Sequence, residues 1–351
     1  MSRDPSGAWI PELDGVRGLA ILLVLMFHLR MIAPELTELG PLSGVIAAGW
    51  SGVDLFFVLC GYLNTRNLLR GADRPGGILR FMARRALRIW PLYLVLIVPY
   101  LALARPSAAE GQVPAWAYAA FVQNWFTAAS YASPNLAKIT WSLAIEEQFY
   151  LVWPLVVAWM PRRALAPVLA LSAAVAICGR LWMAPQDIHL AYYGTVFRMD
   201  AIAAGALLAL FDDLGSAKIW GRAAVFGAVA WLVGGALGAV DHTSASFLPF
   251  GFAGIAAASV AVVGAAVAAP DSLAARALRW RPLRAVGDYS YGLYMVHFLA
   301  YQFVFILHVD RAMHIPLLPR LALALAGAGV LAWLSKRLIE SPALSLKGRF
   351  S

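Results

Sequence analysis

Charged residues are scarce in this sequence. They make up 13% of its 351 residues, whereas an ordinary soluble domain has roughly 25%. Cysteine is scarcer still. Cys60 and Cys178 both lie in apolar runs, which excludes a disulfide framework, and the six histidines show no metal-ligand spacing. Hydrophobic residues make up 61% of the chain. We therefore expect an integral membrane protein with no metal site.

Apolar runs of about twenty residues, long enough to cross a bilayer as helices, recur along the whole chain. They predict an all-α bundle of about ten transmembrane helices, forming a single domain over residues 1–342 with a short cytoplasmic tail at 343–351. The expected spans are 15–33, 44–63, 89–104, 141–160, 164–183, 193–211, 220–240, 248–269, 289–309 and 316–335.

The basic residues predict the orientation of these spans. With the N-terminus placed in the cytoplasm, 21 of the 28 lysines and arginines fall on the inner side, as the positive-inside rule requires. Both termini are then cytoplasmic. The net charge of +9 is explained by topology, and we expect no nucleic-acid partner.

Arg17 and His28 interrupt the first span, "DGVRGLAILLVLMFHLR". Eleven residues of helix turn them onto one face and separate them by roughly 16 Å. Ionisable side chains inside a span are costly and usually functional. Other spans carry similar residues at comparable depth, which predicts a shared polar cavity; these residues are Asp54, Glu146, Arg198, Asp200 and His297.

An arginine-rich loop, "RFMARRALRIWPLY", precedes the third span. If it is helical, Arg84 and Arg88 stack one turn apart. Clustered guanidiniums suit a polyanion such as a nucleotide phosphate. Ordinary positive-inside anchoring and contact with anionic lipids are the alternatives.

Seven segments in chain order resemble a known family, the bacterial membrane-bound acyltransferases of family 3. They are "LDGVRGLAILLVLMFH", "GVDLFFVLCGYL", "RRALRIWPLY", "QNW", "WSLAIEEQFYLVWP", "FRMDAIAAGALLA" and "YSYGLYMVH". The resemblance covers nearly the whole chain. Cys60 stands where the family usually has serine. We expect a stand-alone form, without the soluble esterase-like domain that some relatives append.

The resemblance implies an enzyme of the bacterial inner (plasma) membrane. It would move an acyl group, usually acetyl, from cytoplasmic acyl-CoA to a hydroxyl, with no permanently bound cofactor. Family acceptors include polysaccharides, peptidoglycan, lipids and macrolides, and a carbohydrate is the expected acceptor here.

On this interpretation His28 is the general base, oriented by Glu146, or by Asp54. His28 could instead carry the acyl group covalently. The residues expected to hold the CoA phosphates are Arg17, Arg84, Arg85 and Arg88. Those expected to contact the acceptor or the transition state are Trp141, Ser142, Arg198, Asp200, Tyr294 and His297.

Two other classes of function are compatible with part of the pattern. A proton-coupled transporter or flippase would use buried His, Asp and Glu, but it requires neither the arginine cluster nor the ordered motifs. A lipid-linked glycosyltransferase needs external acidic residues, and the first external loop offers only Glu35 and Glu38. The pair Asp212–Asp213 is expected on the inner side, at a solvated helix end.

Overall fold

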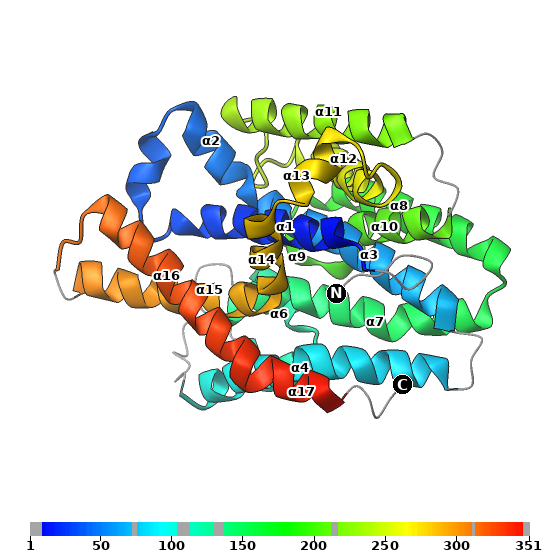
Figure 1. Cartoon of the computed structure of the whole chain (residues 1–351), viewed down its shortest axis with the longest axis horizontal. Coiled ribbons are helices and arrows are strands. Elements are labelled where there is room, and N and C mark those ends of the chain that lie inside the picture. Colours follow the sequence, from blue (N-terminus) through cyan, green and yellow to red (C-terminus); the bar gives the residue numbers. More distant parts are fainter. Residues whose placement is uncertain are drawn as a thin grey trace. The chain divides into compact units, whose positions relative to one another are not determined.

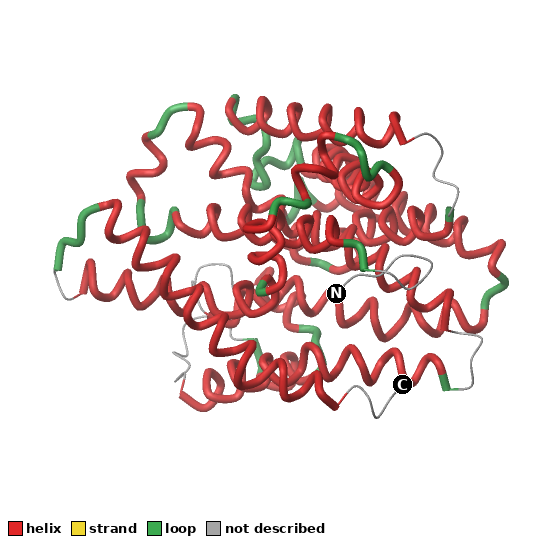
Figure 2. Tube along the Cα trace, in the orientation of Figure 1, coloured by secondary structure: helices red, strands yellow, loops and turns green. Residues whose placement is uncertain are grey.

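The computed structural model describes residues 9–71, 76–103, 113–129, 136–211, 217–310 and 313–346. Within these ranges the chain forms helices joined by loops and contains no β-strand (Figure 2). Its contacts divide it into two units. Unit 1 comprises Met1–Leu59, Asp213–His242 and Gly254–Lys336, and unit 2 comprises Cys60–Asp212, Thr243–Ala253 and Arg337–Ser351.

Unit 1 is built around the first helix of the chain. Its helices are α1 (Pro11–Leu29), α2 (Pro41–Ala47), the start of α3 (Gly52–Gly71), α11 (Ala217–Ala236), most of α12 (Leu248–Ala268), α13 (Leu273–Leu278), α14 (Arg281–Asp288), α15 (Ser290–Phe305) and α16 (Leu317–Ser335). The 3₁₀ turns η1 (Pro34–Glu38) and η2 (Ala48–Ser51) flank α2, and the π-helical turn η5 (Ile306–Asp310) follows α15.

Small residues let the backbones of unit 1 approach closely, as in other membrane bundles. Figure 1 shows α14 crossing α1. A Cβ added at Gly287 of α14 would lie 1.8 Å from the backbone oxygen of Asp14. Only glycine therefore permits this crossing, which fixes the N-terminal half of α1.

Unit 2 contains the rest of α3 and the helices between it and residue 211. They are α4 (Gly77–Leu103), α5 (Ala115–Ala119), α6 (Gln123–Ala129), α7 (Trp141–Trp159), α8 (Arg162–Met183), α9 (Ile188–Tyr193) and α10 (Met199–Leu210), with the 3₁₀ turns η3 (Leu136–Thr140) and η4 (Thr195–Arg198). After α16 come the π-helical turn η6 (Lys336–Glu340) and α17 (Ser341–Ser345). A Cβ at Gly61 would lie 2.0 Å from the backbone oxygen of Ile202, so α3 and α10 also pack backbone to backbone.

The prediction of an all-α membrane protein is confirmed, whereas the count of ten spans stays a prediction. Helices occupy each of the ten expected segments. Among the described residues, seven of the chain's helical segments are long and apolar enough to cross a membrane. The helices α1, α7 and α10 are not among these seven.

Two expected boundaries are wrong. The arginine-rich segment is not a loop but the first part of α4, a helix of 27 residues, because residues 78–90 contain no glycine or proline and are rich in strong helix formers. The sixth expected span, 193–211, is split into η4 and α10. With 12 residues, α10 is about 18 Å long, shorter than the roughly 30 Å hydrocarbon core.

Some predictions lie outside the described residues. These are the solvated helix end at Asp212–Asp213 and residues 347–351 of the expected tail. The start of that tail, residues 343–345, is helical.

Candidate functional site

The central feature of unit 1 is a pair of histidines from α1 and α15. His28 Nδ1 lies 3.1 Å from His297 Nε2, although the two residues are 269 positions apart. His28 Nδ1 also lies 3.1 Å from the carbonyl oxygen of Val24. His297 Nδ1 lies 3.0 Å from the carbonyl oxygen of Leu293 and 2.8 Å from that of Tyr294. The ring of His297 is fully buried.

This network assigns the tautomers of both rings. A carbonyl oxygen only accepts hydrogen bonds, so the Nδ1 atom of each histidine carries the proton. His297 Nε2 is then a lone-pair acceptor, and His28 Nδ1–H donates to it and to Val24. In neutral His28 the Nε2 atom is consequently unprotonated. That atom can accept a proton from a substrate.

Aromatic rings surround the histidine pair. The ring centroid of Phe27 lies 5.1 Å from that of His28, and the Phe298 centroid 6.2 Å from it. His242, in the loop after α11, is half-buried and packs against Phe27 and Trp50. An apolar wall of this kind limits access of water to His28.

Arg17 lies buried in the first half of α1. Its Nη1 donates to Asp14 Oδ1 at 2.6 Å, and Asp14 Oδ2 accepts from Trp9 Nε1 at 2.7 Å. The guanidinium of Arg284 lies 4.3 Å from the centroid of the Trp9 ring. This end of α1 is therefore a network of charged and aromatic groups, with Arg17 held in place by a carboxylate three residues earlier.

Glu146 of α7 heads a chain of hydrogen bonds within unit 2. Tyr150 Oη donates to Glu146 Oε2 at 2.8 Å, and Cys60 Sγ donates to Tyr150 Oη at 3.2 Å. Asn64 Nδ2 donates to the Cys60 sulfur at 3.2 Å. The guanidinium of Arg85 lies 5.5 Å from the centroid of the Tyr150 ring. A serine at position 60 could donate the same bond to Tyr150.

Three of the four arginines expected to bind CoA phosphates, Arg84, Arg85 and Arg88, lie on one helix, α4. Arg84 and Arg88 are one turn apart, as the sequence predicts for a helical segment. Arg88 interacts electrostatically with the carboxylates of Glu146 and Glu340 in the same unit. The arginine cluster of α4 thus faces the hydrogen-bond chain that begins at Glu146.

Arg198 lies in a cage of aromatic rings. Its guanidinium carbon is 4.2 Å from the ring centroid of Phe252, 5.1 Å from that of Tyr192 and 5.6 Å from that of Trp141. The side chain is fully buried, and Ser142 beside Trp141 is buried too. Cation–π contacts of this kind hold a guanidinium in a fixed position. A role of these residues toward the acceptor stays a prediction.

Asp200 has a partner that the sequence does not indicate. Arg180 Nη1 and Nη2 donate to the two carboxylate oxygens of Asp200, at 2.9 and 2.5 Å. Arg180 is fully buried, and its Nη2 also donates to the carbonyl oxygen of Pro249. Arg180 lies in the last turn of α8 and Asp200 in the first turn of α10, where the helix dipoles favour these charges. This pair ties the ends of α8 and α10 together.

The "QNW" segment contributes buried amides whose contacts the sequence does not predict. Gln123 Nε2 donates to the carbonyl and hydroxyl oxygens of Thr140, both at 3.1 Å. Asn124 Nδ2 donates to the carbonyl oxygen of Tyr193 at 3.0 Å and to Thr195 Oγ1 at 2.9 Å. Both amides are fully buried. These bonds anchor α6 to the start of α7 and the end of α9.

The predicted site residues divide between the two units. Unit 1 holds Arg17, His28, Asp54, Tyr294 and His297, and unit 2 holds Arg84, Arg85, Arg88, Trp141, Ser142, Glu146, Arg198 and Asp200. Asp54 is buried in the first turn of α3. The structure brings His28 together with His297 and Glu146 together with Arg85. Orientation of His28 by Glu146 or Asp54 stays a prediction.

Comparisons with known proteins identify the family of the chain. The family described as "Acyltransferase domain" matches residues 10–336. YrhL of Bacillus subtilis is 30% identical over 361 residues, which are 95% of this chain and 55% of that protein. The peptidoglycan O-acetyltransferase OatA of Listeria monocytogenes is 29% identical over 366 residues, 96% of this chain and 56% of that protein.

The O-acetyltransferase OatA of Staphylococcus aureus is 30% identical over 367 residues, 96% of this chain and 57% of that protein. The chain thus spans little more than half the length of the curated relatives it matches. No solved structure matches. Because the family match covers nearly the whole chain, including both histidines of the pair and the arginine-rich start of α4, the chain belongs to this acyltransferase family.

Proposed function

We propose that the protein is a bacterial plasma-membrane O-acetyltransferase that moves an acetyl group from acyl-CoA to a hydroxyl of a cell-envelope glycan. Membership of the acyltransferase family supports the reaction class. The relatives named as O-acetyltransferases and peptidoglycan O-acetyltransferases support a carbohydrate acceptor of that class.

The hydrogen-bonded pair of His28 and His297 carries the proposal. Acyl transfer to an alcohol needs a base for the hydroxyl proton, and the unprotonated Nε2 of His28 supplies one. As Nε2 takes up the proton, His28 becomes a cation, and its Nδ1–H bond to His297 Nε2 strengthens. His297 then acts as the acidic residue does in a serine-protease triad: it orients the base and stabilises its charged form.

The acceptor oxygen attacks the thioester carbonyl carbon while His28 removes its proton, and a tetrahedral oxyanion forms. Collapse of this intermediate breaks the carbon–sulfur bond, and the proton passes from His28 to the departing CoA thiolate. We assign stabilisation of the oxyanion or binding of the acceptor to Trp141, Ser142, Arg198, Asp200 and Tyr294.

The arginines of α4 are proposed to bind the donor. Guanidiniums pair with phosphate oxygens through two parallel hydrogen bonds, and Arg84, Arg85 and Arg88 offer three of them on adjacent turns. Arg17 is proposed to join them. Substitution of Arg84 or Arg88 by alanine should therefore raise the KM for acetyl-CoA more than it alters use of the acceptor.

The first test measures release of free CoA thiol from acetyl-CoA by the purified protein in nanodiscs, with an envelope extract as mixed acceptor. Loss of a general base should lower turnover by about 100- to 10,000-fold, so His28→Ala should be nearly inactive. His189→Ala is the matched control, since His189 lies in α9 of unit 2 and is not among the predicted site residues. Normal turnover by His28→Ala at an unchanged protein level contradicts the assignment.

A second experiment distinguishes a base from an acyl carrier. Incubation with radiolabelled acetyl-CoA without acceptor should leave no label on the protein if His28 acts only as a base. Labelled protein that disappears in His28→Ala would instead assign the covalent route.

A further inference from the structure

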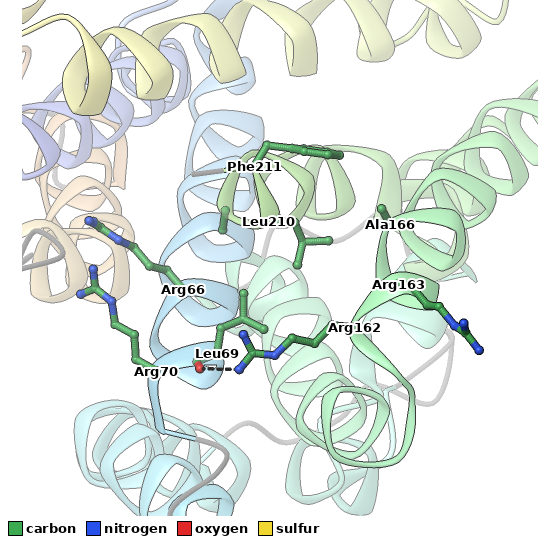
Figure 3. Close-up of a pocket in the computed structure, with 9 residues that line it drawn as sticks. Arg66, Leu69, Arg70, Arg162, Arg163, Ala166, Leu210 and Phe211 are labelled. Carbon is green, nitrogen blue, oxygen red and sulfur yellow. Dashed lines mark hydrogen bonds between the residues drawn. The ribbon is translucent and has the colours of Figure 1, made fainter. Parts of the chain in front are cut away.

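The arginines at the ends of α3 and α8 line a pocket of about 560 Å³ in unit 2. They do not converge on it (Figure 3). Arg66 and Arg70 extend from α3 away from Arg162 and from the apolar wall, and Arg163 points away from the other three. Arg162 Nη2 donates to the carbonyl oxygen of Leu69 at 3.4 Å. A closer arrangement of arginines lies in unit 1, around the first half of α1.

Backbone packing holds α14 against this half of α1. A Cβ added at Gly18 would lie 2.0 Å from the backbone oxygen of Leu283. Arg17 directly precedes Gly18, and Arg284 directly follows Leu283. Because the two backbones touch at this glycine, Arg17 and Arg284 branch from neighbouring points of a rigid helix crossing.

The carboxylates at this end of α1 are already paired with other arginines. Asp14 accepts a hydrogen bond from Arg17, and Glu12 accepts one from Arg279. Arg284 makes no ion pair and no hydrogen bond within the part of the chain that the structure describes, and its buried Nε lacks an acceptor. One guanidinium of the group therefore has no counter-charge.

Arg284 is held in place by an aromatic ring instead. Its guanidinium carbon lies 4.3 Å from the centroid of the Trp9 ring, a cation–π contact. Trp9 Nε1 donates to Asp14 Oδ2 at 2.7 Å, and this carboxylate also binds Arg17. Trp9 exposes 39% of its surface. The cluster of Arg17, Asp14, Trp9 and Arg284 is therefore fixed from both sides, and the edge of the last guanidinium can take an acceptor.

This combination of groups suits a nucleotide. The edge of a guanidinium pairs with phosphate oxygens through parallel hydrogen bonds, and its flat face can at the same time stack on an aromatic ring. An exposed indole ring offers a surface for a nucleobase, since bases stack on aromatic side chains. A phosphate ester of a purine nucleoside would use both Arg284 and Trp9.

We propose that Arg284 and Trp9 bind the nucleotide end of the acyl-CoA donor, an inference that rests on the proposed function. Arg284 pairs with a phosphate, and the adenine packs on the exposed part of the Trp9 ring. His28 lies roughly 16 Å along α1 from Arg17, and an extended pantetheine arm covers a distance of this order. Acyl-CoA carries a diphosphate and a 3′-phosphate, so this subsite adds to the arginines of α4.

The test compares two donors that differ only in the nucleotide. Release of free thiol is measured in nanodiscs with acetyl-CoA and with S-acetylpantetheine, which lacks the adenosine phosphates. The readout is the ratio of kcat/KM for the two donors. A variant that merely folds less well loses activity toward both donors, so its ratio does not change.

Arg284→Gln should lower this ratio by about tenfold, the loss expected for a hydrogen bond to a charged group at a half-buried site. Trp9→Leu should lower it by about threefold, as expected for an exposed cation–π contact. Arg276→Gln is the matched control, because it removes the same charge from an exposed position of α13. It should leave the ratio within about twofold.

Binding of adenosine 3′,5′-bisphosphate, measured by calorimetry, tests the subsite without catalysis. Arg284→Gln should weaken this binding by about tenfold, and Arg276→Gln should not. An unchanged donor ratio and unchanged binding in Arg284→Gln, in a protein that uses acetyl-CoA, would overturn the subsite alone. Equal losses in Arg284→Gln and Arg276→Gln would also overturn it, since they indicate diffuse attraction. An unaltered protein that neither uses nor binds acetyl-CoA would overturn the proposed function together with the subsite.

Discussion

The strongest prediction concerns His297, which contacts the proposed base without touching the reacting atoms. His297→Leu replaces the fully buried imidazole with an apolar group of similar size. The variant loses the Nε2 atom that accepts from His28 Nδ1 at 3.1 Å. We therefore expect His28 to remain in place as a base but to lose the acceptor that stabilises its cationic form.

The size of the effect follows from this one bond. A hydrogen bond to a charged group contributes about 1.5–3 kcal/mol, and each 1.36 kcal/mol of barrier is a factor of ten in rate. His297→Leu should therefore lower kcat by about 10- to 150-fold. The KM for acetyl-CoA should change little, because the bond gains strength only as His28 becomes charged.

The assay is release of CoA thiol in nanodiscs under saturating donor. His297→Gln serves as the conservative variant, because its amide oxygen can reach the position of Nε2 and accept the same bond. It should retain clearly more activity than His297→Leu. Tyr301→Phe is the structural control: Tyr301 packs on the His297 ring and donates to the carbonyl oxygen of Leu25, without contacting His28 through a hydrogen bond.

Two results would contradict this role of His297. The first is turnover by His297→Leu within about threefold of the unaltered protein, a smaller loss than even a weak hydrogen bond to a charged group would cause. The second is an equal loss in His297→Leu, His297→Gln and Tyr301→Phe, which would indicate a general disturbance of the core around α15.

Three further predictions concern stability. Arg180→Met should destabilise the fold by about 3–5 kcal/mol, because it leaves the Asp200 carboxylate buried without its partner; a thermal midpoint that the added Asp200→Leu change does not partly restore would contradict this. Gly287→Ala should lower the thermal midpoint, since its Cβ would meet a backbone oxygen of α1 at 1.8 Å, whereas Gly254→Ala, with open surroundings, should not. Glu35 accepts a hydrogen bond from an arginine of α16 that lowers the pKa of its carboxyl below 4.5. This bond stabilises the fold above that pH and is lost as the pH falls; the effect should be under about 1 kcal/mol and absent in Glu35→Gln, as measured by thermal unfolding between pH 7 and pH 4.

Features set by local helical geometry could be predicted from the sequence. Arg84 and Arg88 are one turn apart on α4, as expected for a helical segment. Two contacts that were not predicted follow from the same geometry. Arg17 pairs with Asp14 three positions earlier, and Tyr150 donates to a carboxylate four positions earlier. These spacings reflect 3.6 residues per turn, so no knowledge of the fold is needed to find them.

Helix length was harder to predict than helix position. The apolar pattern placed a helix in each expected segment, because burial in lipid requires long apolar runs. The apolar pattern did not predict where α4 begins, because the first part of this helix is arginine-rich. It also did not predict that α10 has only 12 residues. Hydropathy reports on the environment of a segment, whereas helix ends depend on caps and on packing with neighbours.

The sequence alone identifies the membrane class, the helical segments and the ionisable residues inside them. The contacts of His28 with His297 and of Arg180 with Asp200 appear only in the folded chain. Helices in a membrane pack through small residues and interhelical hydrogen bonds. The rotation and the neighbours of each helix therefore depend on all the others, and no single helix encodes them.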